Sequence, residues 1–140
     1  AIKKMNIFAS APQKSYEYLI DDLNYINTTN FTIDPSGGNM LFNPKTQRFH
    51  IIDLRSTKKI RTLGDLILLI LTDIPNMPDN KEYYKLEEKI IKKLILAAHT
   101  VGFAFKKQLK LKPRVLEVIK SKKALKIYNE NFDKIPLLTK

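Results

Sequence analysis

Three polar residues at fixed spacing around a short turn are the strongest candidates for chemistry in this sequence. Asp34 and Asn39 bound the segment Asp-Pro-Ser-Gly-Gly-Asn, and Asp53 lies fourteen residues after Asn39. Carboxylate and amide oxygens are the ligands that Mg²⁺ prefers in proteins. One carboxylate can orient a hydroxyl while the amide and the other carboxylate hold a cation. The three residues therefore predict a site for a divalent metal and a hydroxyl.

A β-hairpin is expected to position these residues. Pro35, Gly37 and Gly38 force a turn between Asp34 and Asn39. Two short apolar runs with strand character follow, at residues 40–42 and 49–52, with a turn over residues 43–47 between them. Asn39 and Asp53 are therefore expected at the same open end of a two-stranded ribbon.

The spacing of these residues resembles the pattern of the protein kinase-like superfamily: an Asp, an Asn five residues later, and an Asp at the end of the next hairpin. In that superfamily, such residues orient the hydroxyl and bind Mg²⁺ on ATP. The closer resemblance is to compact bacterial type III effector kinases of the OspG and NleH type. It rests on Gly38-Asn39-Met40-Leu41 and on Ile52-Asp53-Leu54-Arg55, where most kinases have Asp-Phe-Gly. The resemblance covers residues 13–71. It implies that Asp34 is the catalytic acid/base and that Asn39 and Asp53 are the Mg²⁺ and ATP ligands.

Three positions depart from the kinase pattern. Thr32-Ile33 replaces the usual His-Arg, Ser36 stands where Ser/Thr kinases carry a lysine, and Arg55 replaces the glycine. The last two departures are similar to those of the effector kinases, whereas the missing His is not. The simpler alternative is an ordinary turn in which Asp34 and Asn39 cap local backbone groups.

The composition of the whole chain bounds the classes of partner and site. The 140 residues suffice for one domain, and 25 Lys+Arg against 14 Asp+Glu give a net charge of +11. This charge favours nucleotide phosphates, anionic lipid or an acidic protein face; nucleic acid is disfavoured because no recognisable motif accompanies it. The absence of cysteine excludes a disulfide framework and a Cys-bearing zinc site.

The chain in order predicts mainly helices. Residues 1–12 read as a loop or linker remnant, and residues 13–27 carry apolar side chains at helical spacing. A basic segment then leads from Asp53 to Asp65. Only eleven residues separate these two acids, and this segment is too short to form the usual peptide-docking activation segment of a kinase.

An almost wholly apolar run predicts a buried central helix over residues 63–73. Asp65 lies near its start and must find hydrogen-bond donors there; the resemblance implies that it supports the backbone of the catalytic loop. Further helices are expected over residues 80–129: one ending at Gly102, and one from Pro113 to about Tyr128 with a break.

The resulting fold class is mainly α with a short β-hairpin, similar to the helical C-lobe of a kinase over residues 13–140. Within it, residues 32–39 would be the catalytic loop and residues 51–55 the metal-binding end of the hairpin. No Gly-rich phosphate loop is present, and 33 residues before Asp34 are too few for a nucleotide lobe. The small lobe is therefore expected to be lost from this piece or supplied by another chain, leaving the fragment alone a poor catalyst.

The resemblance implies a secreted bacterial effector that acts in the host cytoplasm. The full-length parent would be a Ser/Thr protein kinase that transfers the ATP γ-phosphate to a host protein, with docking on ubiquitin or a ubiquitin-conjugating enzyme. One alternative is a small-molecule phosphotransferase of the aminoglycoside or choline type, although Thr32 breaks its usual His. Another is a pseudokinase or basic interaction module that binds an acidic host partner or an anionic membrane.

Overall fold

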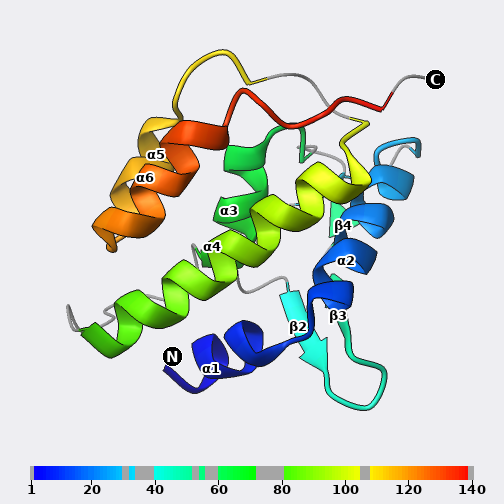
Figure 1. The fold of residues 1–140 in the computed structure, drawn as a ribbon. Helices are drawn as coiled ribbons and strands as arrows, with labels where there is room; N and C mark the ends of the chain where they lie inside the picture. Colours follow the sequence, from blue (N-terminus) through cyan, green and yellow to red (C-terminus); the bar gives the residue numbers. More distant parts are fainter. Residues whose placement is uncertain are drawn as a thin grey trace.

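The computed structural model describes most of the chain as helices packed around one core, with two small antiparallel ladders at one side (Figure 1). The described residues are 2–29, 32–33, 40–51, 54–55, 60–71, 81–104 and 108–138. The expected fold class, mainly α with a short β-hairpin, is confirmed at this level. No helix in the described part of the chain is long and apolar enough to cross a membrane.

The longest described helix, α4 (Lys81–Val101), packs against α1, α2, α3 and α6. Most of its apolar side chains recur every three or four residues and are buried, as the sequence predicts, whereas Leu96 is exposed. The helix ends at Gly102, whose φ of 81° is the left-handed conformation that glycine adopts most easily.

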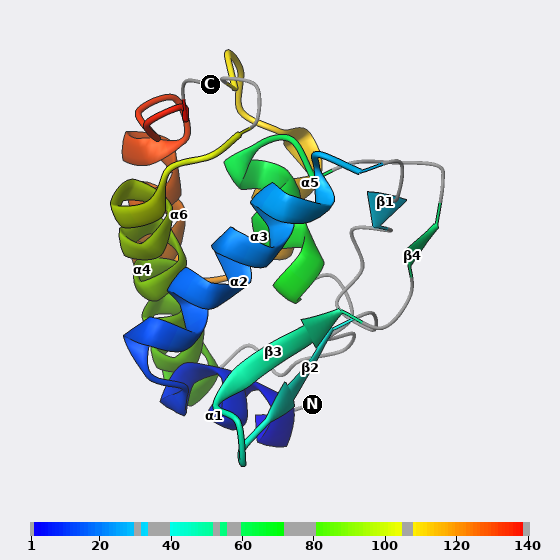
Figure 2. The ribbon, with the colours of Figure 1, turned by 90° about the vertical axis from the view of Figure 1, so that its right-hand side faces the viewer.

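The helix α3 (Leu63–Leu71) is buried along its whole length. This confirms the predicted central helix over residues 63–71; residues 72 and 73 lie outside the described residues. A helix that is apolar on every side must be covered on every side. Figure 2 shows α3 lying behind α2, with α4 and α6 on one side of it and the strands on the other.

The expected loop over residues 1–12 is wrong, because α1 (Ile2–Ser10) is a helix. Met5 and Phe8 are buried in the core. The Lys93 ammonium on α4 donates hydrogen bonds to the carbonyl oxygens of Ala9 and Ala11, at 2.6 and 2.7 Å. This cation therefore satisfies carbonyl groups that the end of α1 leaves without helical partners.

The helix α2 (Gln13–Ile26) confirms the amphipathic helix expected over residues 13–27. Its buried Asn24 donates to the Gly102 carbonyl oxygen and accepts from the Ala104 amide, both at 2.9 Å. One side chain thus fixes the last turn of α2 against the chain that leaves α4.

The expected hairpin is present as β2 (Met40–Asn43) and β3 (Arg48–Ile51), with Met40 opposite Ile51. Its inner face packs on the helices through Phe49, whose ring meets Phe8 at 5.2 Å and Tyr16 at 5.0 Å, edge to face.

A second ladder, which the sequence does not predict, pairs β1 (Thr32–Ile33) with β4 (Leu54–Arg55).

The last part of the chain confirms a helix that begins at Pro113 and is broken once. It forms α5 (Pro113–Val118) and α6 (Lys122–Asn131), and Ser121 caps α6 by accepting from the Ala124 amide. The tail then returns to the end of α4. Phe103 donates to the Pro136 carbonyl oxygen at 2.9 Å, and Leu138 donates to the Phe103 carbonyl oxygen at 2.7 Å.

Candidate functional site

Three of the four predicted site residues, Asp34, Asn39 and Asp53, lie outside the described residues. The structure does describe the strand ends that adjoin them in the chain. Ile33 lies opposite Leu54 in the β1–β4 ladder, and Met40 lies opposite Ile51 in the β2–β3 ladder. The ladders therefore place the chain before Asp34 next to the chain after Asp53.

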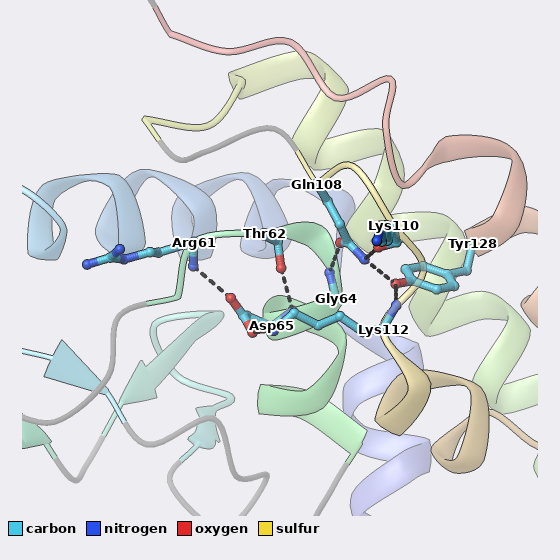
Figure 3. Close-up of polar contacts among 8 residues, drawn as sticks. All are labelled: Arg61, Thr62, Gly64, Asp65, Gln108, Lys110, Lys112 and Tyr128. Carbon is cyan, nitrogen blue, oxygen red and sulfur yellow. Dashed lines mark hydrogen bonds and ion pairs between the residues drawn. The ribbon is translucent and has the colours of Figure 1, made fainter.

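The fourth residue, Asp65, lies in the first turn of α3 and is 9% exposed. Its Oδ2 accepts the Arg61 amide at 3.0 Å, and its Oδ1 contacts the Lys112 ammonium at 2.5 Å (Figure 3). Its own amide donates to the Thr62 hydroxyl at 3.2 Å. The acid beside an apolar helix thus finds the donors that its burial requires. The expected contact with the catalytic loop lies outside the described residues.

A network of polar groups surrounds the Asp65–Lys112 pair. The Gln108 side-chain oxygen Oε1 accepts a hydrogen bond from the Gly64 backbone amide at 3.0 Å. The Gln108 side-chain nitrogen Nε2 donates to the Tyr128 hydroxyl at 2.7 Å. The same hydroxyl accepts the Lys112 backbone amide at 3.3 Å. Figure 3 shows these side chains converging on the start of α3 from the segment before α5 and from α6. The network ties α6 to the start of α3.

Sequence reasoning missed Gln108, Lys112 and Tyr128 as partners of this site. A buried acid calls for a cation, but 25 Lys and Arg residues in the sequence offer no way to choose among them. Lys112 also lies 47 positions from Asp65. The glycine at position 64, inside a helix, is a local sign of close packing. A Cβ at this position would lie only 2.8 Å from the stem of the Lys112 side chain.

A second buried acid, Glu87 on α4, was also missed because its neighbours form an apolar stripe. Its Oε1 accepts the amides of Lys120 and Ser121, at 2.8 and 2.7 Å. Burial raises the pKa of Glu87, while the Ser121 amide, the Tyr83 hydroxyl and the Lys120 amide each oppose this shift. Glu87 therefore holds the break between α5 and α6 and is a structural rather than a ligand-binding acid.

The described residues contain no cluster of three His, Cys, Asp or Glu side chains that could hold a metal. A surface pocket of about 300 Å³ lies between α1 and the hairpin, lined by Ile7, Ser10, Ala11, Phe42, Pro44 and Gln47. It holds no ionisable side chain and offers no group for acid–base chemistry.

Comparison of the chain with protein-family models, with curated protein sequences and with solved structures finds no match in any of the three.

Proposed function

We propose that the chain is the helical lobe of a protein kinase-like phosphotransferase that uses Mg²⁺ and ATP. The observation that carries the proposal is the pairing of Ile33 with Leu54 and of Met40 with Ile51. Three of the paired residues, Ile33, Leu54 and Met40, are the sequence neighbours of Asp34, Asp53 and Asn39.

The pairing supports a common site through chain connectivity. Asp34 follows Ile33 by one peptide bond, and Asp53 precedes Leu54 by one, and Ile33 and Leu54 are paired at the same end of one ladder. Asn39 likewise precedes Met40 at the end of the other ladder.

The two ladder ends must also be close to each other. Only two residues join Ile51 to Leu54, and three extended residue steps span at most about 11 Å. This limit on the separation of the two ladder ends is compatible with a metal site shared by the three residues.

Each residue has a distinct role in the proposed reaction. Asp34 accepts the proton of the attacking hydroxyl as a new bond forms between that oxygen and the γ-phosphorus. The bond from the γ-phosphorus to the bridging oxygen breaks, and ADP leaves with the electron pair. Asn39 and Asp53 would hold the Mg²⁺, which would supply the positive charge that neutralises the phosphate groups.

Asp65 and Lys112 are proposed to support this arrangement. Arg61, which donates its amide to Asp65, lies six residues after the end of β4 in the chain. Anchoring that amide fixes one end of the chain that follows Asp53. In the proposed enzyme, Asp65 is a positioning residue and touches neither metal nor substrate.

The proposal extends to a class of substrate and a setting through the residues that resemble the effector kinases. They support transfer to a Ser or Thr hydroxyl of a host protein by a secreted bacterial enzyme in the host cytoplasm. Ubiquitin or a ubiquitin-conjugating enzyme is the proposed docking partner, and a small lobe elsewhere in the parent protein or on another chain would complete the ATP site.

The test combines metal binding with phosphate transfer. Mn²⁺ binding to this chain, measured by paramagnetic relaxation, and transfer from labelled ATP by the parent protein with its small lobe would be compared across variants. Asp53→Asn is expected to lose both properties. Asp34→Asn is expected to keep metal binding and to lose about 10²- to 10⁴-fold in transfer, the range for a general base.

Asp21→Asn, an exposed acid on α2, is the matched control and should change neither property. Transfer to small alcohols but not to protein would instead indicate a small-molecule phosphotransferase. Nucleotide binding that survives both site substitutions, with no transfer, would overturn the proposal in favour of a binding module.

A further inference from the structure

The outer face of α4 carries lysines at three- and four-residue spacing. Lys85, Lys89 and Lys92 are exposed, and Leu96, one turn further on, is 54% exposed. Positions at this spacing lie above one another on one side of a helix. The lysines and the leucine therefore form one stripe that points into solvent.

A second group of lysines lies alongside on α6. Two contacts fix the alignment of the helices: the Ser121 hydroxyl donates to Glu88 at 2.8 Å, and His99 meets the Asn131 side chain at 3.2 Å. The start of α6 therefore lies beside Glu88 and its end lies beside His99, further along α4. The two helices run parallel, and Figure 1 shows them side by side.

The two groups of lysines lie on neighbouring helices. α4 packs its buried residues against α1, α2, α3 and α6, and Tyr128 of α6 lies beside Gly64 of α3. The exposed lysines of both helices lie outside these contacts, so the two groups are neighbours on the surface. We name this surface the lysine face, and it comprises Lys85, Lys89, Lys92, Lys122, Lys123 and Lys126.

The charge of the lysine face is poorly compensated. Among the described residues, the ion pair found there is Lys126 with Glu130, at 4.0 Å and largely exposed. Lys85 and Lys89 repel each other at i,i+4, as do Lys122 and Lys126. The charge of Lys89 also reaches Lys93, whose pKa is lowered first by burial and then by this neighbour. An anionic surface would relieve this repulsion.

We propose that the lysine face docks the protein on an anionic lipid membrane. Six long cationic side chains over two adjacent helices suit a broad anionic surface, and Leu96 can enter the headgroup region. This proposal stands independently of the proposed phosphotransfer.

A membrane explains the lysine face better than a protein or a nucleic acid does. The strongest contacts of protein interfaces cluster in well-packed pockets, and none of the six lysines lines the pocket beside Ile7 or the pocket beside Phe103. Nucleic-acid surfaces that bind single strands stack bases on exposed aromatic rings. On α4 and α6, however, Tyr83 and Tyr128 are buried and Tyr84 is half-buried, so no ring of these helices is fully exposed.

Vesicle sedimentation with the full chain tests the proposal. Vesicles of phosphatidylcholine alone would be compared with vesicles that contain about 30% phosphatidylserine, at about 0.1 M salt. The test variant is Lys85→Glu/Lys89→Glu/Lys92→Glu. The control variant is Lys14→Glu/Lys45→Glu/Lys110→Glu, which changes three exposed lysines on other elements. Both variants lower the net charge from +11 by six, because each substitution removes two charges.

The wild-type chain is expected to bind the phosphatidylserine vesicles and not the neutral ones. The test variant should bind about a hundredfold more weakly, from about fivefold for each lysine removed near the surface. The control variant should lose less than about fivefold. Circular dichroism of each variant verifies folding, and a Lys→Gln version of the test variant replaces it if charge reversal unfolds the chain.

Equal losses in the two variants would show that net charge alone matters and would overturn the proposal. So would a lack of binding to phosphatidylserine vesicles, or tighter binding to an oligonucleotide that competes with the vesicles.

Discussion

The side chain of Lys112 crosses directly over the α-carbon of Gly64. A Cβ at Gly64 would lie 2.8 Å from Lys112 Cδ and 3.1 Å from the Tyr128 hydroxyl. The glycine thus lets the lysine reach Asp65 and lets α6 approach the start of α3. This close approach joins elements that are far apart in the sequence, and it makes the first turn of α3 a sensitive position in the fold.

Gly64→Ala is expected to destabilise the chain by about 1–3 kcal/mol, because the added methyl group overpacks the contact with Lys112. Helix propensity alone would favour alanine by about 0.5–1 kcal/mol, so the sign of the effect is informative. Urea denaturation measures the change. In a Lys112→Ala background the same substitution should cost less; a stabilising effect of Gly64→Ala in the wild-type chain would contradict the close packing of Gly64 against Lys112.

Lys112→Met is expected to cost about 1–2 kcal/mol, because it leaves the largely buried Asp65 carboxylate without its cation. Adding Asp65→Asn should recover part of the loss, since an amide oxygen still accepts the Arg61 amide and carries no charge. Denaturation of the single and double variants yields the coupling between the two positions. Lys110→Met removes an exposed lysine nearby and should be close to neutral; additive losses would exclude a direct interaction.

Glu87→Gln is expected to change how stability depends on pH. Burial raises the pKa of Glu87 in the folded chain above its ordinary value of 4.5, so the folded state binds the proton more tightly than the unfolded state. The resulting stabilisation is present below the ordinary pKa and is lost as pH rises through the folded-state pKa. The wild-type chain should therefore lose stability relative to the variant as pH rises above 4.5 and through the folded-state pKa of Glu87.

Denaturation midpoints across this pH range provide the measurement for Glu87. Glu117→Gln, on the exposed side of α5, serves as the matched control. Parallel curves for the wild-type chain and Glu87→Gln would show that the carboxyl group does not titrate differently in the two states.

Asn24→Ala is expected to destabilise the chain by about 1–3 kcal/mol, because it leaves the Gly102 carbonyl and the Ala104 amide without their partner. Thermal denaturation and amide hydrogen exchange at Ala104 should both register the loss. The same replacement at the exposed Asn129 of α6 is the control and should be within about 0.5 kcal/mol of wild type.

The elements with a strong period could be predicted from the sequence. The stripe of α2, the apolar run of α3 and the long helix that stops at Gly102 all follow from local patterns that tertiary packing reinforces. The hairpin followed from two apolar runs around a turn. The β1–β4 ladder did not, because two residues in each strand are too few to leave a pattern.

The helix α1 shows why other parts escaped prediction. A nine-residue helix is marginal by itself, and its stability comes from core contacts of Met5 and Phe8. It also depends on the Lys93 ammonium, 84 positions away from Ala9. The partners of Asp65 and Glu87 likewise come from distant segments, so no local pattern could have identified them. Asp34, Asn39 and Asp53 lie outside the described residues, so the site that they form remains a prediction of the sequence, supported by the ladders beside them.

The return of the tail to Phe103 has a practical consequence for any engineered form of the protein. Residues 135–138 form no helix, yet their backbone is hydrogen-bonded to Phe103. These bonds join the chain that follows α4 to the chain that follows α6. Deleting residues 136–140 would remove both of these hydrogen bonds together. A reporter fused after Lys140 should therefore be joined through a flexible spacer, so that it does not disturb the pairing of Leu138 with Phe103.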